Sequence, residues 1–189
     1  MLIPALIVQL FILVNPLSSF PMLIGAYKKK MDVRKIAIYS VMIAFAIAIS
    51  FVFLGPLFFT AFGISLNSLM IAGGIILVLL GIDTVKLEEG HGKNANEMDG
   101  YISLIASPML TGPATISFII LKSYEIGAMD LVMNITATFV LIGIIFLLSA
   151  MMIKKVNTRI MSIVSKIFGL FLTAIGIEMI AKGIQAFLI

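Results

Sequence analysis

The sequence predicts an all-α membrane protein, and three observations carry that prediction. Of its 189 residues, 61% are apolar and only 12% are charged, and the mean hydropathy is +1.21, far above that of a water-soluble domain. Runs of about 20 apolar residues, each able to cross roughly 30 Å of hydrocarbon, recur along the chain. The first run starts at Met1 without a basic leader or a small-residue cleavage site, so we expect no cleavable signal peptide.

The apolar runs predict six spans, separated by short connections. The longest connection, KLEEGHGKNANEMDG, is polar and rich in Gly and Asn, which predicts a solvated linker between two halves. We therefore divide the chain into a first three-helix unit (1–86), a cytoplasmic linker (87–100) and a second three-helix unit (101–189), which together form one membrane domain. The predicted spans are Leu2 to Tyr27, Ile36 to Phe58, Leu66 to Ile82, Tyr101 to Leu121, Leu131 to Ile153 and Ile163 to Ala181.

The distribution of Lys and Arg predicts the orientation. Cytoplasmic loops carry an excess of these residues, and the first, third and fifth loops with their flanks hold eleven of them, whereas the opposite side holds only Lys122 and Lys182. We expect both termini outside the cell membrane of a prokaryote, and we expect no nucleic-acid partner for the basic stretch KKKMDVRK. The eleven are Lys28, Lys29, Lys30, Arg34, Lys35, Lys86, Lys93, Lys154, Lys155, Arg159 and Lys166.

Two prolines five residues apart interrupt the first predicted span, in the stretch NPLSSFP (15–21). A proline inside a helix removes a hydrogen bond and clashes with the preceding turn, at about 3 kcal/mol or more. The fourth predicted span repeats this spacing in SPMLTGP (107–113), and a short polar residue, Asn15 or Ser107, precedes the first proline of each stretch. Simple kinks are the alternative, but paired prolines with hydroxyl residues or glycine between them favour a local break in each helix.

A second pair of similar stretches indicates an internal repeat. GIILVLLGID (74–83) and GLFLTAIGIE (169–178) share two glycines, an isoleucine and a final acid. The offsets of the two pairs, 92 and 95 residues, are similar, and the pairs occur in the same order. Each repeat has an odd number of spans, so the second must enter the membrane from the opposite face. We predict a 3+3 inverted-topology repeat with discontinuous first and fourth helices.

The predicted breaks form a candidate binding site, because unwound backbone at membrane depth is stable only when it is buried in protein or lines a wet cavity. Pro21 and Pro113 suit the first position of a new half-helix, whose free N–H groups bind anions or carboxylates. Free carbonyls near Asn15 and Ser107 would accept from an ammonium group or coordinate a cation, so a zwitterion such as an amino acid fits. The predicted substrate-binding residues are Asn15, Pro16, Ser18, Ser19, Pro21, Ser107, Pro108, Thr111, Gly112 and Pro113.

With NPLSSFP, SPMLTGPATIS and its 189-residue, six-span length, the chain resembles the MarC family of integral membrane proteins. That family includes archaeal and bacterial transporters of small neutral amino acids such as glycine and alanine. The resemblance covers the whole chain and implies a secondary transporter that works by alternating access around a central site. It points to Asn15, Pro16 and Pro21 in the first half and to Pro108, Gly112 and Pro113 in the second.

Glu178 is the one acid well inside a predicted span, which makes it a candidate for ion coupling. Lys182 lies four residues later on the same helix face, so an interfacial ion pair is the alternative that we favour. The glycines of the repeated stretches lie two turns apart, which is typical of close helix packing. His91 lies alone in a polar loop, and we expect neither a metal site nor another cofactor.

Three function classes were compared on these features. A channel or a translocator of lipids or small metabolites could use the same cavity, but a channel would be expected to show rings of charge or carbonyl filters. An intramembrane enzyme is disfavoured, because the spans contain no His or Cys for zinc and no apposed pair of acids. A secondary transporter of a small neutral amino acid, coupled to H⁺ or Na⁺, is the predicted function, and a homo-oligomer is an assembly compatible with it.

Overall fold

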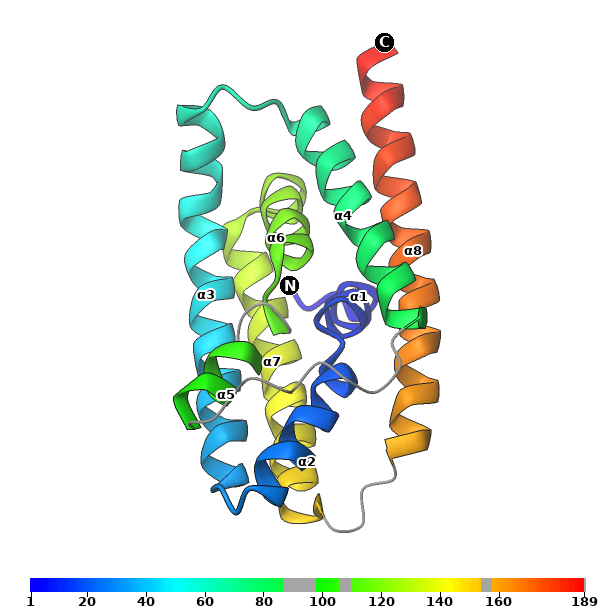
Figure 1. Ribbon diagram of the computed structural model, residues 1–189. Helices are drawn as coiled ribbons and strands as arrows, with labels where there is room; N and C mark the ends of the chain where they lie inside the picture. The colour runs from blue at the N-terminus through cyan, green and yellow to red at the C-terminus, as the bar shows by residue number, and fades with distance from the viewer. Residues whose placement is uncertain (87–97, 106–109, 154–157, 189) are drawn as a thin grey trace.

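The computed structural model describes residues 1–86, 98–105, 110–153 and 158–188, and no strand occurs within these ranges. Figure 1 shows the helices running roughly along the long axis of the molecule, with shorter tilted helices between them. In chain order the elements are α1 (Pro4–Val14), the 3-10 helix η1 (Pro16–Ser19), α2 (Phe20–Lys28), α3 (Val33–Ala61), α4 (Leu66–Lys86), α5 (Met98–Leu104), α6 (Pro113–Ile126), α7 (Ala128–Met151) and α8 (Thr158–Leu188).

Five helical segments among the described residues are long and apolar enough to cross a membrane. They correspond to five of the six predicted spans: Pro4–Lys28, Val33–Phe58, Leu66–Val85, Ala128–Met151 and Ser162–Ala186. The predicted fourth span, 101–121, does not form one long helix. It is divided between α5, of 7 residues, and α6, of 14 residues, and neither reaches the roughly 20 residues that a membrane span requires.

The outward faces of the long helices are apolar, as expected for contact with lipid. Leu57 of α3, Leu79 of α4 and Leu170 of α8 are each more than half exposed. An apolar surface of this extent would be an aggregation liability in water. Together with the length of the helices, it identifies a multi-span integral membrane protein.

The buried face of α7 shows how the core is built. Its buried residues recur every three or four positions, which places them on one stripe of the helix. Phe146 in this stripe packs against Phe20 at the start of α2, with ring centroids 5.7 Å apart, and Phe139 packs against Phe45 of α3 at 5.6 Å. This stripe therefore joins α7 to both α2 and α3.

Helices α4 and α8 pack along each other in antiparallel directions, with glycines at the points of contact. A Cβ added at Gly74 would lie 2.5 Å from the carbonyl oxygen of Gly176, and one at Gly176 would lie 2.6 Å from that of Gly74. Gly81 and Gly169 show the same reciprocal approach, at 2.6 and 2.8 Å. No side chain fits at these positions, which confirms close packing as the role of the repeated glycines.

The interrupted segments lie between two helix pairs. Helix α4 packs on α8, and α3 packs on α7. Figure 1 shows α1 and α6 in the space between α3 on one side and the α4–α8 pair on the other. In agreement, α1 contacts α7 and α8, whereas α6 contacts α3 and α4. The centre of the fold is thus occupied by α1 and α6, which flank the two interruptions with paired prolines.

Candidate functional site

The first interruption is set by Asn15 and Pro16. Asn15 adopts the left-handed conformation (φ 42°, ψ 62°) and ends α1 by donating its N–H to the carbonyl of Phe11 at 3.1 Å. Asparagine tolerates this conformation better than most residues, and Pro16 has no N–H with which to continue α1. The chain then makes the single turn of η1 before α2 begins at Phe20.

The polar groups of Asn15 are almost all paired. Its side-chain Nδ2 donates to Ser165 Oγ of α8 at 3.2 Å. Its carbonyl accepts from the Ser18 N–H at 3.1 Å and from Ser18 Oγ at 2.8 Å. Of the carbonyls expected to be free near Asn15, that of Asn15 itself is therefore not free, because Ser18 donates to it twice. A substrate ammonium group or a cation would have to use an acceptor other than the Asn15 carbonyl.

The second half of the first interruption also differs from expectation. Pro21 was expected to begin a new half-helix with free N–H groups, but η1 runs directly into α2, which starts one residue earlier. The N–H of Phe20 is donated to the carbonyl of Leu17. The new helix therefore begins one residue before Pro21, and its first N–H is already used within the chain.

Ser19 is the exception in this well-paired segment. Its side chain is fully buried, and its Oγ has no hydrogen-bond partner. A buried hydroxyl without a partner costs about 1 to 3 kcal/mol, so such groups are rare and call for an explanation. Pro16 is buried beside it, and Ser18 is half-buried. Among the predicted first-half residues, Ser19 is the one whose buried side-chain oxygen lacks a hydrogen-bond partner.

The second interruption is described only from Leu110 onward, so Ser107 and Pro108 lie outside the described residues. Thr111 is buried and donates its hydroxyl to the carbonyl of Ala44 in α3 at 3.0 Å. Gly112 is buried and extended (φ −82°, ψ 176°), and α6 begins directly after it with Pro113 as its first residue.

The N-terminus of α6 is uncapped by side chains. Ala114 and Thr115 in its first turn are 1% and 2% exposed. Among the backbone hydrogen bonds between described residues, Ile116 donates its N–H to the carbonyl of Gly112. The N–H groups of Ala114 and Thr115 take part in none of these bonds. The first N–H groups of a helix have no partner within it and carry a partial positive charge. This end of α6 can therefore donate to an anion or a carboxylate.

The two interruptions are fixed to different helices. The side chain of Asn15 is bonded to α8, and that of Thr111 is bonded to α3. Helix α1 contacts α6, but no hydrogen bond between described residues joins Asn15–Ser19 to Thr111–Gly112. Ser165 was not foreseen from the sequence, because its partner Asn15 is 150 positions away and no local pattern links the two.

Glu178 lies away from both interruptions and pairs with Lys182, with Oε1 and Nζ 2.7 Å apart and both side chains more than 60% exposed. The expected ion pair is therefore present. Within the ranges that the structure describes, no group of three or more His, Cys, Asp or Glu residues could hold a metal ion.

Comparison with known proteins agrees with this picture of a helical membrane protein. A UPF0056 membrane protein of Methanocaldococcus jannaschii is 30% identical, over 96% of this chain and 95% of its own length. UPF0056 membrane proteins of Bacillus subtilis and Aquifex aeolicus are 26% and 28% identical, each over 94% of this chain and over 92% and 89% of their own lengths. No solved structure matches the chain significantly.

The family comparison covers nearly the whole sequence. The profile of the MarC family of integral membrane proteins matches residues 1–188. Relatives with matching lengths occur in both archaea and bacteria. The chain therefore belongs to the MarC family of integral membrane proteins.

Proposed function

We propose that this protein is a secondary transporter of small neutral amino acids, of the glycine and alanine class, that works by alternating access around the two interruptions. The observation that carries the proposal is the interruption at Asn15, where a membrane-length segment contains a left-handed residue and a buried, unpaired hydroxyl at Ser19. Non-helical backbone at membrane depth is tolerated only inside protein or beside a cavity, and discontinuous helices form the substrate sites of many transporters.

The proposed architecture has six spans in two inverted three-span units, residues 1–86 and 101–189, joined by the linker 87–100. The reciprocal glycine contacts support it. The sequence repeat equates Gly74 with Gly169 and Gly81 with Gly176, whereas the contacts pair Gly74 with Gly176 and Gly81 with Gly169. A two-fold axis produces this crossed pattern, because a contact between two residues implies the same contact between their equivalents.

The polar groups at the two interruptions suit a zwitterion. The open first turn of α6, at Ala114 and Thr115, supplies N–H donors and a favourable dipole for a carboxylate. The carbonyl of Asn15 is occupied by Ser18, so the unpaired Ser19 hydroxyl takes its place in the proposal as the acceptor for the ammonium group. The restriction to small side chains comes from the family resemblance.

The coupling ion is H⁺ or Na⁺ in this proposal, and Glu178 is the candidate acid for proton coupling. Its exposed pairing with Lys182 favours a structural role for Glu178. In the proposed topology both termini lie outside and Lys28 to Lys35 lie in the cytoplasm. Because the chain has no cysteine, Lys30→Cys gives a single label site, and rapid labelling by an impermeant reagent in intact cells would exclude this topology.

Uptake of labelled glycine and alanine into proteoliposomes tests the transport itself. A carrier should concentrate the amino acid when an inward proton or sodium gradient is imposed. Preloading with unlabelled alanine should accelerate entry of the labelled form. A channel would give no such acceleration, and a lipid translocator would instead move labelled phospholipid between leaflets. Uptake no faster than in protein-free vesicles under every gradient would refute the proposal.

A further inference from the structure

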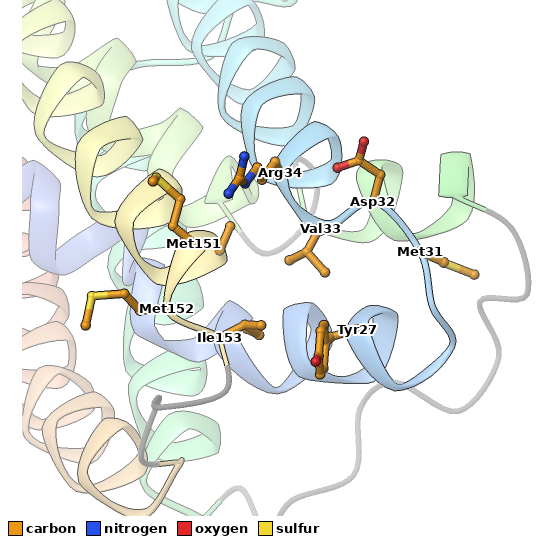
Figure 2. A pocket seen from close by; sticks show the side chains of 9 residues that line it. Tyr27, Met31, Asp32, Val33, Arg34, Met151, Met152 and Ile153 are labelled. Atoms are coloured by element: carbon orange, nitrogen blue, oxygen red, sulfur yellow. The ribbon is translucent and has the colours of Figure 1, made fainter.

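A pocket of about 730 Å³ lies where the ends of three helices meet, and none of the residues of the proposed transport site lines it. Its walls come from the end of α2, the α2–α3 turn, the start of α3 and the end of α7. Figure 2 shows Tyr27 and Val33 on facing elements, with Met151, Met152 and Ile153 along one side. Because α2, α3 and α7 belong to membrane-length segments, their ends place this pocket near the membrane–water boundary.

The wall of the pocket is mainly apolar. Methionine is unbranched and adapts its shape to flexible ligands, and Tyr27 combines an apolar ring with a polar tip, as is common at membrane interfaces. Such a surface suits the upper part of an acyl chain better than a small hydrophilic ion. The apolar lining residues are Met31, Val33, Ala150, Met151, Met152 and Ile153.

The polar part of the lining carries a cation that is not neutralised. Arg34 is exposed, and the ion pairs formed among the described residues do not include it. Asp32, the acid in the lining, is already engaged: its Oδ1 accepts the N–H of Lys35 at 3.2 Å and caps α3, and its Oδ2 lies 3.9 Å from Lys35 Nζ. The guanidinium of Arg34 is therefore open to an external anion.

The turn beside the pocket holds further positive charge in a costly backbone conformation. Lys30 is left-handed (φ 59°), where a residue with a Cβ is disfavoured and glycine is usual. The turn is closed by the N–H of Lys30 to Tyr27 and the N–H of Met31 to Ala26, at 2.9 and 3.0 Å. A lysine at this position instead of glycine keeps one more charge at the rim, next to the exposed Lys28.

We propose that this pocket binds an anionic phospholipid, with the phosphate on Arg34 and the first part of an acyl chain along Val33, Met151 and Met152. Basic pockets between helices at the membrane surface are suited to acidic headgroups, and Arg can bind a phosphate through two parallel hydrogen bonds. A free anion would leave the apolar wall uncovered, and an uncharged lipid would leave Arg34 without a partner. The site is independent of the proposed transport function.

Lipid binding can be measured on the purified full-length protein by native mass spectrometry, with dioleoylphosphatidylglycerol added and dioleoylphosphatidylcholine as the comparison. Arg34→Gln should weaken retention of phosphatidylglycerol about fivefold to tenfold, as expected for loss of a charge that contacts a phosphate. Lys166→Gln removes the same charge from an exposed position on α8, outside the lining and its rim, and should change retention by about twofold or less. Equal losses in the two variants would mean diffuse surface attraction and would overturn the proposal.

Two further variants separate lipid binding from folding. Met152→Glu places a carboxylate on the pocket wall and should abolish retention, whereas Met129→Glu, at the exposed opposite end of α7, should not. Lys30→Gly relieves the left-handed strain, so it should keep or raise the melting temperature while it lowers retention. Equal retention of the two lipids by wild type, or displacement of phosphatidylglycerol by millimolar inorganic phosphate, would also exclude a phospholipid site.

Discussion

The two interruptions have similar sequences but different backbones. Before the second proline of each motif stands Phe20 or Gly112. Phe20 is helical (φ −61°, ψ −40°) although the following proline disfavours that conformation, and its ring is fully buried against Phe146. Gly112 has no side chain to pack and takes the extended conformation that proline favours. Packing thus overrides the local preference in the first half, and the local preference prevails in the second.

This difference assigns different chemistry to the two halves. The first half pairs the Asn15 carbonyl and the Phe20 N–H through η1 and leaves a buried, unpaired hydroxyl at Ser19. The second half pairs its hydroxyl, Thr111, with α3 and leaves the N–H groups at the start of α6 open. A ligand held between the halves would therefore meet a hydroxyl from one and backbone donors from the other, which suits an asymmetric ligand such as an amino acid.

The largest effect should come from closing the open end of α6. Gly112→Leu places a bulky side chain beside the buried first turn of α6, and we expect it to abolish amino-acid uptake by occupying the space for the carboxylate. Gly143→Ala is the control, because its new Cβ would lie at an ordinary 3.7 Å from Val41. If Gly112→Leu transported normally in proteoliposomes, the α6 end would not be the site.

Phe20→Gly should convert the first interruption toward the second. It removes the buried contact with Phe146, and we expect the free energy of unfolding in detergent to fall by about 3 to 5 kcal/mol. Phe53→Gly, at a position on α3 that is about half exposed, should cost only about 1 kcal/mol through helix propensity. Equal losses would show that packing does not hold Phe20 helical.

Two substitutions at Asn15 separate the energetic contribution of its left-handed backbone from that of its side-chain hydrogen bond. Asn15→Ala loses the bond to Ser165 and puts alanine, which tolerates the left-handed region less well than asparagine, at this position, so we expect a loss of about 2 to 3 kcal/mol. Asn15→Gly loses only the side-chain bond, and should cost about 1 kcal/mol. Thermal unfolding of both variants measures the difference in their stabilities. If the glycine variant were no more stable than the alanine variant, the left-handed backbone at position 15 would not contribute to the cost.

Ser19→Ala should have little effect on folding and a clear effect on uptake. Its hydroxyl is buried without a partner, so its removal should be neutral or slightly stabilising. If it accepts from the substrate, the apparent substrate affinity should fall about fivefold to tenfold. Ser50→Ala, where an exposed hydroxyl bonds only Ala46 of its own helix, is the control. An unchanged affinity would remove Ser19 from the proposed site.

Glu178→Gln should have the smallest effect. An exposed pair four residues apart on a helix contributes about 0.2 to 0.5 kcal/mol, and we expect uptake to persist under both ion gradients. Lys182→Gln should behave in the same way. If Glu178→Gln alone eliminated gradient-driven uptake, this acid would be the coupling residue and the mechanism would be centred on α8.

The class, five of the spans and the glycine-mediated packing follow from the amino-acid sequence alone. Lipid leaves few choices, because a membrane-length apolar run must satisfy its backbone internally as a helix. The paired prolines predict the end of α1 and the start of α6 to within about one residue of their observed positions. This is possible because the missing N–H of a proline affects only the adjacent helical turn.

Which polar groups remain without a partner depends on contacts between residues far apart in the sequence. The sequence could not reveal that Ser18 would occupy the carbonyl of Asn15, or that Phe146, 126 positions from Phe20, would hold α2 continuous with η1. Ser165 and the pocket beside Arg34 likewise combine residues more than 100 positions apart. The energy differences between such alternatives are about 1 to 3 kcal/mol, and long-range packing supplies energies of that size.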